Sequence, residues 1–264
     1  MVLLVNKEKK CHIGRDISTE VRSAFSTAGR RLPPFTLVRL DVSGLGDEEV
    51  VAGRALTPLE LATFHQFRFT RRRREWLAGR LAVKEAVCGL APEICRSRAA
   101  VEVAVDRRGK PFLGRPAGAG HRLFVAISHS GDTALGLASR LPCALDIQEL
   151  RSALKRVASR FVHQEEEALL GQCHADRLHA LGMLWAAKEA LRKHLPIWPL
   201  LGFLENRLTG VTGLAGGRLF SFQGVSAARR VPDCLPDVHV GWHDGKALAI
   251  IVAGGRALEK CSTF

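Results

Sequence analysis

The order of helices and strands that hydrophobic periodicity predicts is the feature that most constrains the fold. Residues 35–41 and 143–150 alternate apolar and polar side chains as strands do, and each stretch precedes helical patterns that are followed by further strands. A doubly wound parallel sheet would instead alternate strands with helices, and no glycine-rich dinucleotide fingerprint or Walker sequence is present. The order favours an α+β fold with antiparallel sheets and two similar halves, residues 1–140 and 141–264.

The spacing of apolar residues also places the individual elements. Apart from the two opening strands, we expect helices over 57–69, 75–90, 154–161, 164–170 and 177–195. Further strands are expected over 99–105, 123–127, 134–139, 218–223, 238–242 and 247–253. Gly109 marks a turn, and residues 128–132 form the tip of a hairpin between two apolar strands.

Composition narrows the class of protein. The chain has 264 residues, of which 47% are hydrophobic, so it can bury a sizeable core and is not disordered. The longest uncharged apolar stretch, 195–204, contains two prolines and is too short to span a membrane, and the N-terminus lacks a secretory apolar run. The seven cysteines are scattered without a C-x-x-C pair, as in reduced proteins. We therefore expect a cytoplasmic protein with unpaired thiols and no membrane partner.

Positive charge is concentrated in the first half. The chain has 39 Lys and Arg against 26 Asp and Glu, a net charge of +13. Residues 1–140 hold 24 basic against 14 acidic residues, a net charge of +10, and six of the arginines lie between positions 68 and 80. An excess of this kind attracts phosphates, nucleic acid or an acidic protein. A solvated helix face or a nonspecific nucleic-acid patch is the simplest interpretation of the arginine run.

The strand 143–150 is the first of three segments that carry chemistry. Side chains alternate between the faces of a strand, so Asp146 and Gln148 share one face while Leu145 and Ile147 share the other. Oxygen ligands of this kind suit Mg²⁺, which takes one or two protein carboxylates and completes its shell with water and phosphate oxygens. Taken alone, this segment is equally typical of an exposed strand face.

The helix 177–195 is the second segment. Trp185, Glu189 and Lys193 are spaced four residues apart and form one ridge, on a different face from the core stripe that contains Leu184 and Leu191. A second metal carboxylate and a phosphate-binding ammonium could therefore come from one rigid element. The alternative is an ordinary Glu to Lys surface pair.

The hairpin tip is the third segment. Ser128, His129, Ser130 and Gly131 offer several donors to a phosphate or a ribose. A nucleophilic hydrolase is not indicated, because a G-x-S-x-G elbow is lacking here and adjacent strand residues such as Ser128 and His129 point to opposite faces.

In order and spacing, these segments resemble the 4′-phosphopantetheinyl transferase superfamily, in its larger pseudo-dimeric form. The likeness spans roughly residues 57–195. The motifs that carry it are, in chain order, Glu75 to Arg80 (E-W-L-A-G-R), Gly109-Lys110-Pro111, Ser128-His129-Ser130, Ala144 to Gln148 (A-L-D-I-Q), Arg160-Phe161-Val162 with Glu165 and Glu166, and Trp185 to Lys193 (W-A-A-K-E-A-L-R-K).

The resemblance implies an enzyme that transfers the 4′-phosphopantetheine arm of coenzyme A to a serine of an apo acyl or peptidyl carrier protein, with release of adenosine 3′,5′-bisphosphate. It also implies two α+β halves related by a pseudo-twofold axis, an active site in the cleft between them, a monomer, an acidic carrier protein as partner and no specific nucleic acid. The first half would bind the phosphates of coenzyme A, and the second would supply the Mg²⁺ ligands and catalytic residues.

The resemblance further implies a role for each site residue. The adenosine phosphates would be held by four residues of the first half, supported by Ser128: Arg74, Arg80, Lys110 and His129. Asp146 and Glu189 would coordinate Mg²⁺, Lys193 would reach the pyrophosphate, and Glu189 would act as the base for the carrier serine.

One position departs from the family pattern. The family usually has a second acid where this chain has Gln148, and a neutral amide oxygen binds Mg²⁺ more weakly than a carboxylate. We retain Gln148 as a third candidate metal ligand beside Asp146 and Glu189.

Other functions stay open at this level. A basic nucleic-acid-binding protein would explain the charge, but it has no need for the Asp146 and Glu189 pair, and the chain contains no tyrosine to stack on bases. The remaining alternatives are another Mg²⁺-dependent phosphoryl transferase acting on nucleotides and an inactive protein that docks a carrier; the latter would be expected to lose Glu189 or Lys193, and both are present.

Overall fold

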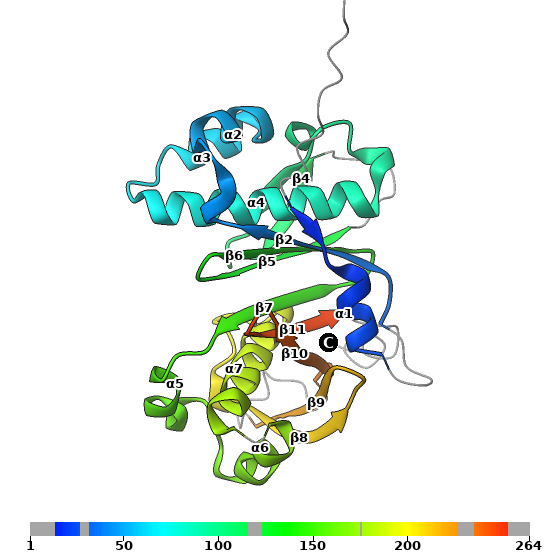
Figure 1. The fold of residues 1–264 in the computed structure, drawn as a ribbon, viewed down its shortest axis with the longest axis vertical. Coiled ribbons are helices and arrows are strands. Elements are labelled where there is room, and N and C mark those ends of the chain that lie inside the picture. Colours follow the sequence, from blue (N-terminus) through cyan, green and yellow to red (C-terminus); the bar gives the residue numbers. More distant parts are fainter. Residues whose placement is uncertain (1–13, 27–31, 116–122, 175, 226–234, 253–264) are drawn as a thin grey trace, which may run out of the picture.

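Two antiparallel sheets pack against each other, and each carries one long helix on its outer face, in the computed structural model of this protein (Figure 1). The structure describes residues 14–26, 32–115, 123–174, 176–225 and 235–252. Every strand pair in these ranges runs antiparallel. The predicted α+β class is confirmed.

The first sheet and a separate two-stranded hairpin belong to the first half. Its strands are β1 Arg15–Asp16, β2 Phe35–Asp41, β3 Glu102–Val105, β4 Pro111–Arg115, β5 Phe124–Ser130 and β6 Thr133–Ser139. Its α-helices are α1 Ser18–Ala24, α2 Glu48–Ala55, α3 Pro58–Phe64 and α4 Thr70–Leu90, with short 3-10 turns η1 Ser43–Leu45, η2 Pro92–Ile94 and η3 Arg98–Ala100.

The second sheet and its helices follow from Cys143 onward. Its strands are β7 Cys143–Glu149, β8 Asn206–Gly213, β9 Gly217–Gly224, β10 Val238–His243 and β11 Lys246–Val252. Its α-helices are α5 Ala153–Arg156, α6 Glu167–Cys173 and α7 Arg177–His194, with 3-10 turns η4 Ala158–Arg160, η5 Gln164–Glu166 and η6 Phe203–Glu205.

Three neighbouring strands of each sheet follow a corresponding order, β2-β6-β5 in the first and β7-β11-β10 in the second. The first has the order β1-β2-β6-β5 and the second the order β7-β11-β10-β9-β8. In the first sheet β2 pairs with β6 and β6 with β5, and in the second β7 pairs with β11 and β11 with β10. The long helices α4 and α7 cover corresponding strands from opposite sides, so the layers run α4, first sheet, second sheet, α7 (Figure 1).

Alternation along the opening strands divides their side chains between two cores. Leu37 of β2 and Leu145 and Ile147 of β7 are buried between the sheets. The residues of the other parity face the helices, as Leu40 does toward α4 and Ala144 toward α7. The helix α4 approaches β6 so closely that a Cβ on Gly136 would lie 2.2 Å from the carbonyl carbon of Ala82, so only glycine fits there.

Several predicted ends of helices and strands are wrong. The helix predicted over 57–69 ends at Phe64, and the next begins at Thr70 instead of 75, because arginines at the start of α4 find partners in other elements. The residues Ser128 to Ser130, predicted at a hairpin tip, form the end of β5, and the turn consists of Gly131 and Asp132. The periodicity also missed α1, α2 and β8.

The expectation that all thiols are unpaired is wrong for one pair. Cys88 at the end of α4 and Cys95 after η2 form a disulfide, while Cys143 and Cys173 are free and buried. Pairing between residues on either side of a short turn leaves no spacing signature of the C-x-x-C type. Cys11, Cys234 and Cys261, and Ala253 at the end of the last predicted strand, lie outside the described residues. Within those residues, the structure contains no helix long and apolar enough to cross a membrane.

Candidate active site

A cavity of about 780 Å³ is lined by residues from both halves of the chain. Its lining includes residues from the end of β5, the first half of α4, the polar face of β7 and one ridge of α7. Seven of the nine site residues predicted from the sequence line it: Arg80, Ser128, His129, Asp146, Gln148, Glu189 and Lys193. Arg74 and Lys110 lie elsewhere.

Asp146 is the most connected acid in this cavity. Its side chain is almost completely buried, and its Oδ1 accepts hydrogen bonds from Ser128 Oγ at 2.9 Å and from Lys193 Nζ at 2.6 Å. These partners come from β5 in the first half and α7 in the second. The carboxylate therefore ties three elements together at the floor of the cavity.

Glu189 faces the same cavity from α7. Its Oε1 accepts a hydrogen bond from Arg192 Nη1 at 2.7 Å. Burial raises the pKa of Glu189 and the nearby Asp146 carboxylate adds to the rise, although Arg192 and Lys193 act against it. The ridge Trp185, Glu189 and Lys193 predicted from the sequence is confirmed, because all three residues line the cavity.

A second ridge comes from α4. Arg72, Trp76 and Arg80 are spaced four residues apart, as Trp185, Glu189 and Lys193 are on α7, and all three line the cavity. The guanidinium of Arg80 lies 4.6 Å from the ring centroid of Trp76. Arg80 is only 7% exposed, and its Nε is buried without a hydrogen-bond partner. Burial lowers the pKa of Arg80 and the charge of Glu60 acts against this, but a guanidinium keeps its charge in proteins, so Arg80 is a buried cation with an unpartnered Nε.

Arg72 is a site residue that the sequence analysis missed. Its Nη1 lies 3.2 Å from His129 Nε2. Burial lowers the pKa of His129, Glu75 acts against this and Arg72 adds to it, so the shift favours a neutral imidazole that can accept from the guanidinium. The spacing of Arg72, Trp76 and Arg80 was a usable signal, since it repeats the spacing of the ridge recognised on α7.

The two predicted phosphate ligands outside the cavity have other partners. The guanidinium of Arg74 donates to the carbonyl oxygens of Val42, Ser43 and Gly46 at 3.1 to 3.2 Å, and so closes the turn before α2. Lys110 Nζ donates to the carbonyl oxygen of His194 at 3.5 Å, and Lys110 lines a smaller neighbouring cavity that Lys193 also borders. Arg72, and not the predicted Arg74, therefore lines the cavity.

Serines of β5 join the two sheets beside the cavity. Oγ of Ser128 accepts from the backbone N–H of Ile147 at 3.2 Å, and Oγ of Ser130 accepts from that of Glu149 at 3.0 Å. These donors lie on the edge of β7 that no other described strand pairs with. Alternation then turns His129 to the opposite face, toward α4. Ser128 and Ser130 thus connect β5 to β7, while Ser128 and His129 line the cavity.

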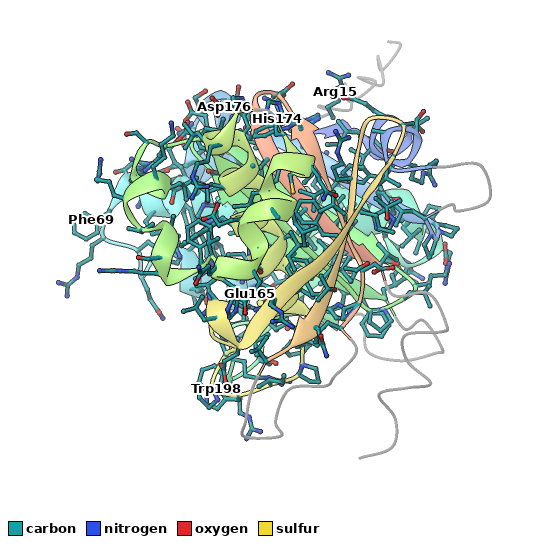
Figure 2. All side chains as sticks on the ribbon, turned by 90° about the horizontal axis from the view of Figure 1, so that it is seen from below. Arg15, Phe69, Glu165, His174, Asp176 and Trp198 are labelled. Carbon is teal, nitrogen blue, oxygen red and sulfur yellow. A yellow bond between two sulfur atoms is a disulfide. The ribbon has the colours of Figure 1, made fainter. Side chains whose placement is uncertain are left out.

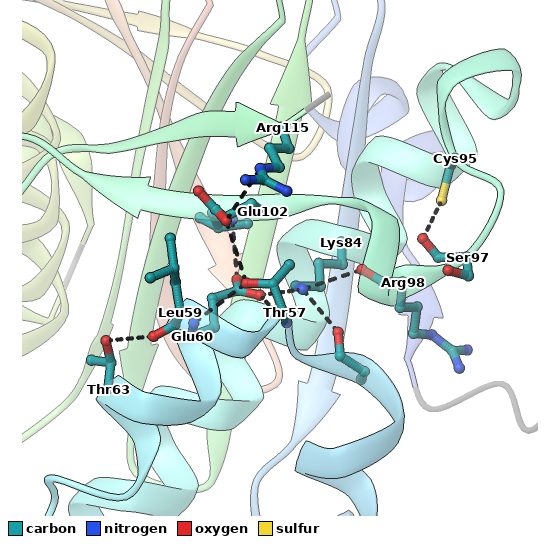
Figure 3. Close-up of polar contacts among 12 residues, drawn as sticks. Thr57, Leu59, Glu60, Thr63, Lys84, Cys95, Ser97, Arg98, Glu102 and Arg115 are labelled. Atoms are coloured by element: carbon teal, nitrogen blue, oxygen red, sulfur yellow. Dashed lines mark hydrogen bonds and ion pairs between the residues drawn. The ribbon is translucent and has the colours of Figure 1, made fainter. Parts of the chain in front are cut away.

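A buried lysine anchors α4 (Figure 3). Nζ of Lys84 donates to Glu60 Oε2 at 2.5 Å and to the carbonyl oxygens of Ala55 and Arg98. The other carboxylate oxygen of Glu60 accepts from the backbone N–H of Val103 at the start of the β3–β4 hairpin. One ion pair therefore joins α3, α4 and β3.

An equivalent lysine anchors α7. Nζ of Lys188 lies 2.8 Å from Glu166 Oε1, and it donates to the carbonyl oxygens of Phe161 and Asn206. Glu166 in turn accepts from the backbone N–H of Leu208 in β8. Each lysine begins a Lys-Glu-Ala sequence, which places Glu189 one residue after the anchor and Glu85 at the matching position of α4. The anchor on α7 fixes the rotation of the helix that presents Glu189.

The acids of the cavity suit a magnesium ion. The described part of the chain contains no group of three His, Cys, Asp or Glu residues that could hold a metal. Mg²⁺ needs only one or two protein carboxylates, however, and Asp146 and Glu189 line one cavity and influence each other electrostatically. These two residues would hold the ion. Gln148 also lines the cavity, and its Nε2 donates to the carbonyl oxygen of Glu149 at 2.7 Å.

The cavity thus holds the buried guanidinium of Arg80 and the ammonium of Lys193 beside the carboxylates of Asp146 and Glu189. No family model and no curated protein matches the chain. Among solved structures, it is similar to a holo-(acyl-carrier-protein) synthase of Bacillus anthracis in complex with CoA (3',5'-ADP), at 26% identity over 39% of this chain and 91% of that chain, with a TM-score of 0.35. A second is the synthase of Thermotoga maritima, at 26% identity over 46% and 72% of the two chains, with a TM-score of 0.34. A third, from Neisseria meningitidis, shares 25% identity over 39% and 94%, with a TM-score of 0.32.

Proposed function

We propose that this protein is a 4′-phosphopantetheinyl transferase of the larger, pseudo-dimeric type. Its substrates would be coenzyme A and the apo form of an acyl or peptidyl carrier protein, and its products the holo carrier and adenosine 3′,5′-bisphosphate. The motifs between residues 57 and 195 suggest this reaction, and five of the six motifs contribute residues to the lining of one cavity.

The observation that carries the proposal is the position of Arg80. A buried guanidinium with an unpartnered Nε faces the same cavity as the carboxylates of Asp146 and Glu189. A buried charged group with an unsatisfied N–H donor is unfavourable, which supports an anionic ligand for Arg80 in this cavity. Coenzyme A carries a 3′-phosphate and a pyrophosphate, which need cations and a metal-binding pair of acids in one site.

The residues divide the reaction between them. The carrier serine Oγ attacks the phosphorus that bears the pantetheine arm, the bond from this phosphorus to the adenosine 5′-phosphate oxygen breaks, and Glu189 takes the serine proton. Arg72, Arg80 and His129 would bind the phosphates of the adenosine end, and Lys193 would contact the pyrophosphate. Mg²⁺, when bound, would stabilise the negative charge that develops on the leaving phosphate.

The repeated architecture supports the pseudo-twofold relation. The strand orders β2-β6-β5 and β7-β11-β10 correspond, and each half contains a buried Lys to Glu anchor on its long helix. In this proposal, residues 1–140 bind the phosphates of coenzyme A and residues 141–264 hold Mg²⁺ and the base. A monomer in the cytoplasm would then be complete, since one chain supplies both sides of the cavity.

A mass-spectrometric assay tests the function. Purified protein is incubated with coenzyme A, Mg²⁺ and a panel of apo carrier proteins from fatty-acid, polyketide, peptide and lysine pathways. We expect one or more carriers to gain the mass of the phosphopantetheine arm, with equimolar release of adenosine 3′,5′-bisphosphate. Calorimetric titration with coenzyme A, ATP and duplex DNA, each with and without Mg²⁺, supplies the comparison. Binding of ATP or DNA in preference to coenzyme A, with no carrier modified, would contradict the proposal.

A further inference from the structure

Arg192 holds the carboxylate of Glu189 on α7. The two residues are three positions apart on the helix, and Nη1 of Arg192 donates to Oε1 of Glu189 at 2.7 Å. The side chains are only 21% exposed for Arg192 and 22% for Glu189. An exposed Arg to Glu pair at this spacing contributes little to stability. This pair is largely withdrawn from water, so its geometry depends on what else contacts the guanidinium.

Two further contacts hold the guanidinium of Arg192, and both come from the chain after α7. Nε donates to the carbonyl oxygen of Leu201 at 2.5 Å, and the guanidinium carbon lies 4.5 Å from the ring centroid of Phe203. A guanidinium is planar, so donation from Nε, donation from Nη1 and a ring nearby together fix its position and its orientation. We name the group formed by Arg192, Leu201 and Phe203 the arginine clamp.

The ring of Phe203 is itself held by buried neighbours. It lies 4.5 Å from the ring centroid of Trp185, and the carbonyl oxygen of Phe203 accepts from Nζ of the anchor Lys188 at 3.2 Å. Leu201 is only 1% exposed. Trp198, earlier in the same segment, is 61% exposed and lies at the edge of the molecule (Figure 2). The inner part of this segment is therefore fixed by the core and can hold Arg192 in place.

The arginine clamp leaves the second carboxylate oxygen of Glu189 available. Oε1 accepts from Arg192, and within the described residues this carboxylate has no other hydrogen bond, although its side chain lines the large cavity. Oε2 is thus the oxygen that can contact a bound molecule. A glutamate side chain has three torsions, so without the clamp this oxygen would sample several positions. A displacement of about 1 Å in a reacting group can lower a rate about 100-fold.

We propose that Arg192 is a positioning residue, which acts through the arginine clamp to hold Oε2 of Glu189 toward the reacting groups in the large cavity. The inference rests on the proposed function, in which Glu189 is the base for the carrier serine and a Mg²⁺ ligand. Arg192 lines the smaller cavity and not the large one. It would therefore act through Glu189 and not by contact with the substrate phosphates.

Kinetic constants of Arg192→Met and Arg192→Lys test the role of the guanidinium, with an apo carrier that the unaltered protein loads. We expect Arg192→Met to lower kcat about 10- to 100-fold, while KM for the carrier and Kd for coenzyme A stay within twofold. Arg192→Lys should recover only part of this loss, because an ammonium lacks the planar fork that contacts Leu201 and Glu189 together. Full recovery in Arg192→Lys would show that charge alone is needed and would overturn the positioning role.

A double-mutant cycle tests whether Phe203 acts through Arg192. Phe203→Leu keeps an apolar side chain but removes the aromatic ring, so we expect kcat to fall about threefold. Adding Phe203→Leu to Arg192→Met should change kcat by less than twofold, whereas independent effects would multiply and overturn the clamp. If Arg192→Met does not fold, Arg192→Lys and Phe203→Leu supply the test.

A second Arg to Glu pair on α7 provides the matched control. Arg177 pairs with Glu167 of α6, its Nη2 donating to Oε1 at 2.8 Å, and neither residue lines the large cavity. We expect kcat of Arg177→Met to equal that of the unaltered protein. An equal loss of kcat in Arg177→Met and Arg192→Met would overturn the positioning role, because any lost ion pair of α7 would then have the same effect.

The Nε–H resonance of Arg192 reports the clamp without turnover. In ¹H–¹⁵N NMR spectra of the unaltered protein without ligands, we expect one arginine Nε–H signal that exchanges slowly with water and is missing in Arg192→Met. In Phe203→Leu this signal should shift, because the ring current of Phe203 is lost. An Arg192 Nε–H that exchanges as fast as that of the exposed Arg177 would overturn the clamp.

The remaining outcomes separate failure of the inference from failure of the proposed function. A change in kcat of less than twofold in Arg192→Met, with transfer intact in the unaltered protein, would overturn the positioning role alone. A weakening of coenzyme A binding as large as the loss of kcat would make Arg192 a substrate ligand and would also overturn it. If the unaltered protein loads no apo carrier although its Arg192 Nε–H signal is protected, the proposed function is wrong and the positioning role falls with it.

Discussion

Lys193 Nζ lies 2.6 Å from Oδ1 of Asp146 and thereby joins α7 to β7 at the floor of the cavity. The ammonium occupies one oxygen of a carboxylate that would also hold Mg²⁺. Under the proposed function, the lysine and the metal ion would therefore compete for Asp146 in the absence of substrate. When coenzyme A is bound, a pyrophosphate oxygen can take over the lysine.

Because of this competition, we expect Lys193→Met to change the affinity for Mg²⁺ and the affinity for coenzyme A in opposite directions. Removing the ammonium should tighten Mg²⁺ binding to the free protein about tenfold, because a positive charge next to the ligand disappears. The same change should weaken coenzyme A binding by a similar factor, since the pyrophosphate loses a cation. Calorimetric titration of Mg²⁺ and of coenzyme A measures both. Weaker Mg²⁺ binding in Lys193→Met would show that the lysine supports the metal site.

The carboxylates should be indispensable and Gln148 should not. We expect Asp146→Ala and Glu189→Ala to abolish transfer in a coenzyme A to apo-carrier assay. Gln148→Glu should retain activity and bind Mg²⁺ as well as or better than the unaltered protein, because a carboxylate is a stronger oxygen ligand than an amide. Full activity of either alanine variant would remove the basis for the metal assignment.

The arginines should differ in what they affect. Arg72→Ala and Arg80→Ala should each weaken coenzyme A binding about 10- to 100-fold, the range for hydrogen bonds to charged groups. Arg80→Lys should lose less than Arg80→Ala, because the charge remains although the planar fork is lost. Arg74→Ala should reduce stability by about 1 to 2 kcal/mol through its three carbonyl partners without changing coenzyme A affinity. A larger affinity loss in Arg74→Ala than in Arg72→Ala would reverse our assignment.

The raised pKa of Glu189 predicts a stability that falls with pH. The folded protein binds the Glu189 proton more tightly than the unfolded chain, whose Glu titrates near 4.5. Stability without metal should therefore decrease as pH rises through the interval between the unfolded and the folded pKa, and Glu189→Gln should remove this decrease. The variant should be more stable than the unaltered protein at neutral pH, with the difference vanishing below pH 4.5. Urea unfolding at several pH values, without Mg²⁺, measures this difference, and parallel curves for the two proteins would contradict the prediction.

The two lysine anchors should behave alike. Lys84→Met and Lys188→Met each leave a buried glutamate without its partner, which typically costs about 3 to 5 kcal/mol. Replacing the glutamate as well, in Lys84→Met with Glu60→Gln or in Lys188→Met with Glu166→Gln, should recover part of that loss. Denaturant unfolding compares the four variants. An effect confined to one half would argue against equivalent roles for the two anchors.

The sequence by itself determined most of what depends on neighbouring residues along the chain. Period-two alternation placed Asp146 and Gln148 on one face of β7, and helical spacing placed Trp185, Glu189 and Lys193 on one ridge, because both arrangements follow from backbone geometry alone. The α+β class followed from the order of these patterns. The repeated Lys-Glu-Ala sequence was also present as a sign of the duplicated anchors, although only the structure showed its meaning.

Tertiary structure decided which of several residues of the same type, such as the arginines of α4, reaches the site. Arg72 and Arg74 are two residues apart on one helix, and whether either meets the cavity depends on where α2, β5 and the turn before α2 pack around α4. The position of Lys110 and the pairing of Cys88 with Cys95 likewise depend on segments that approach through folding. Local periodicity fixes the direction of a side chain relative to its own backbone, but long-range packing fixes what lies in that direction.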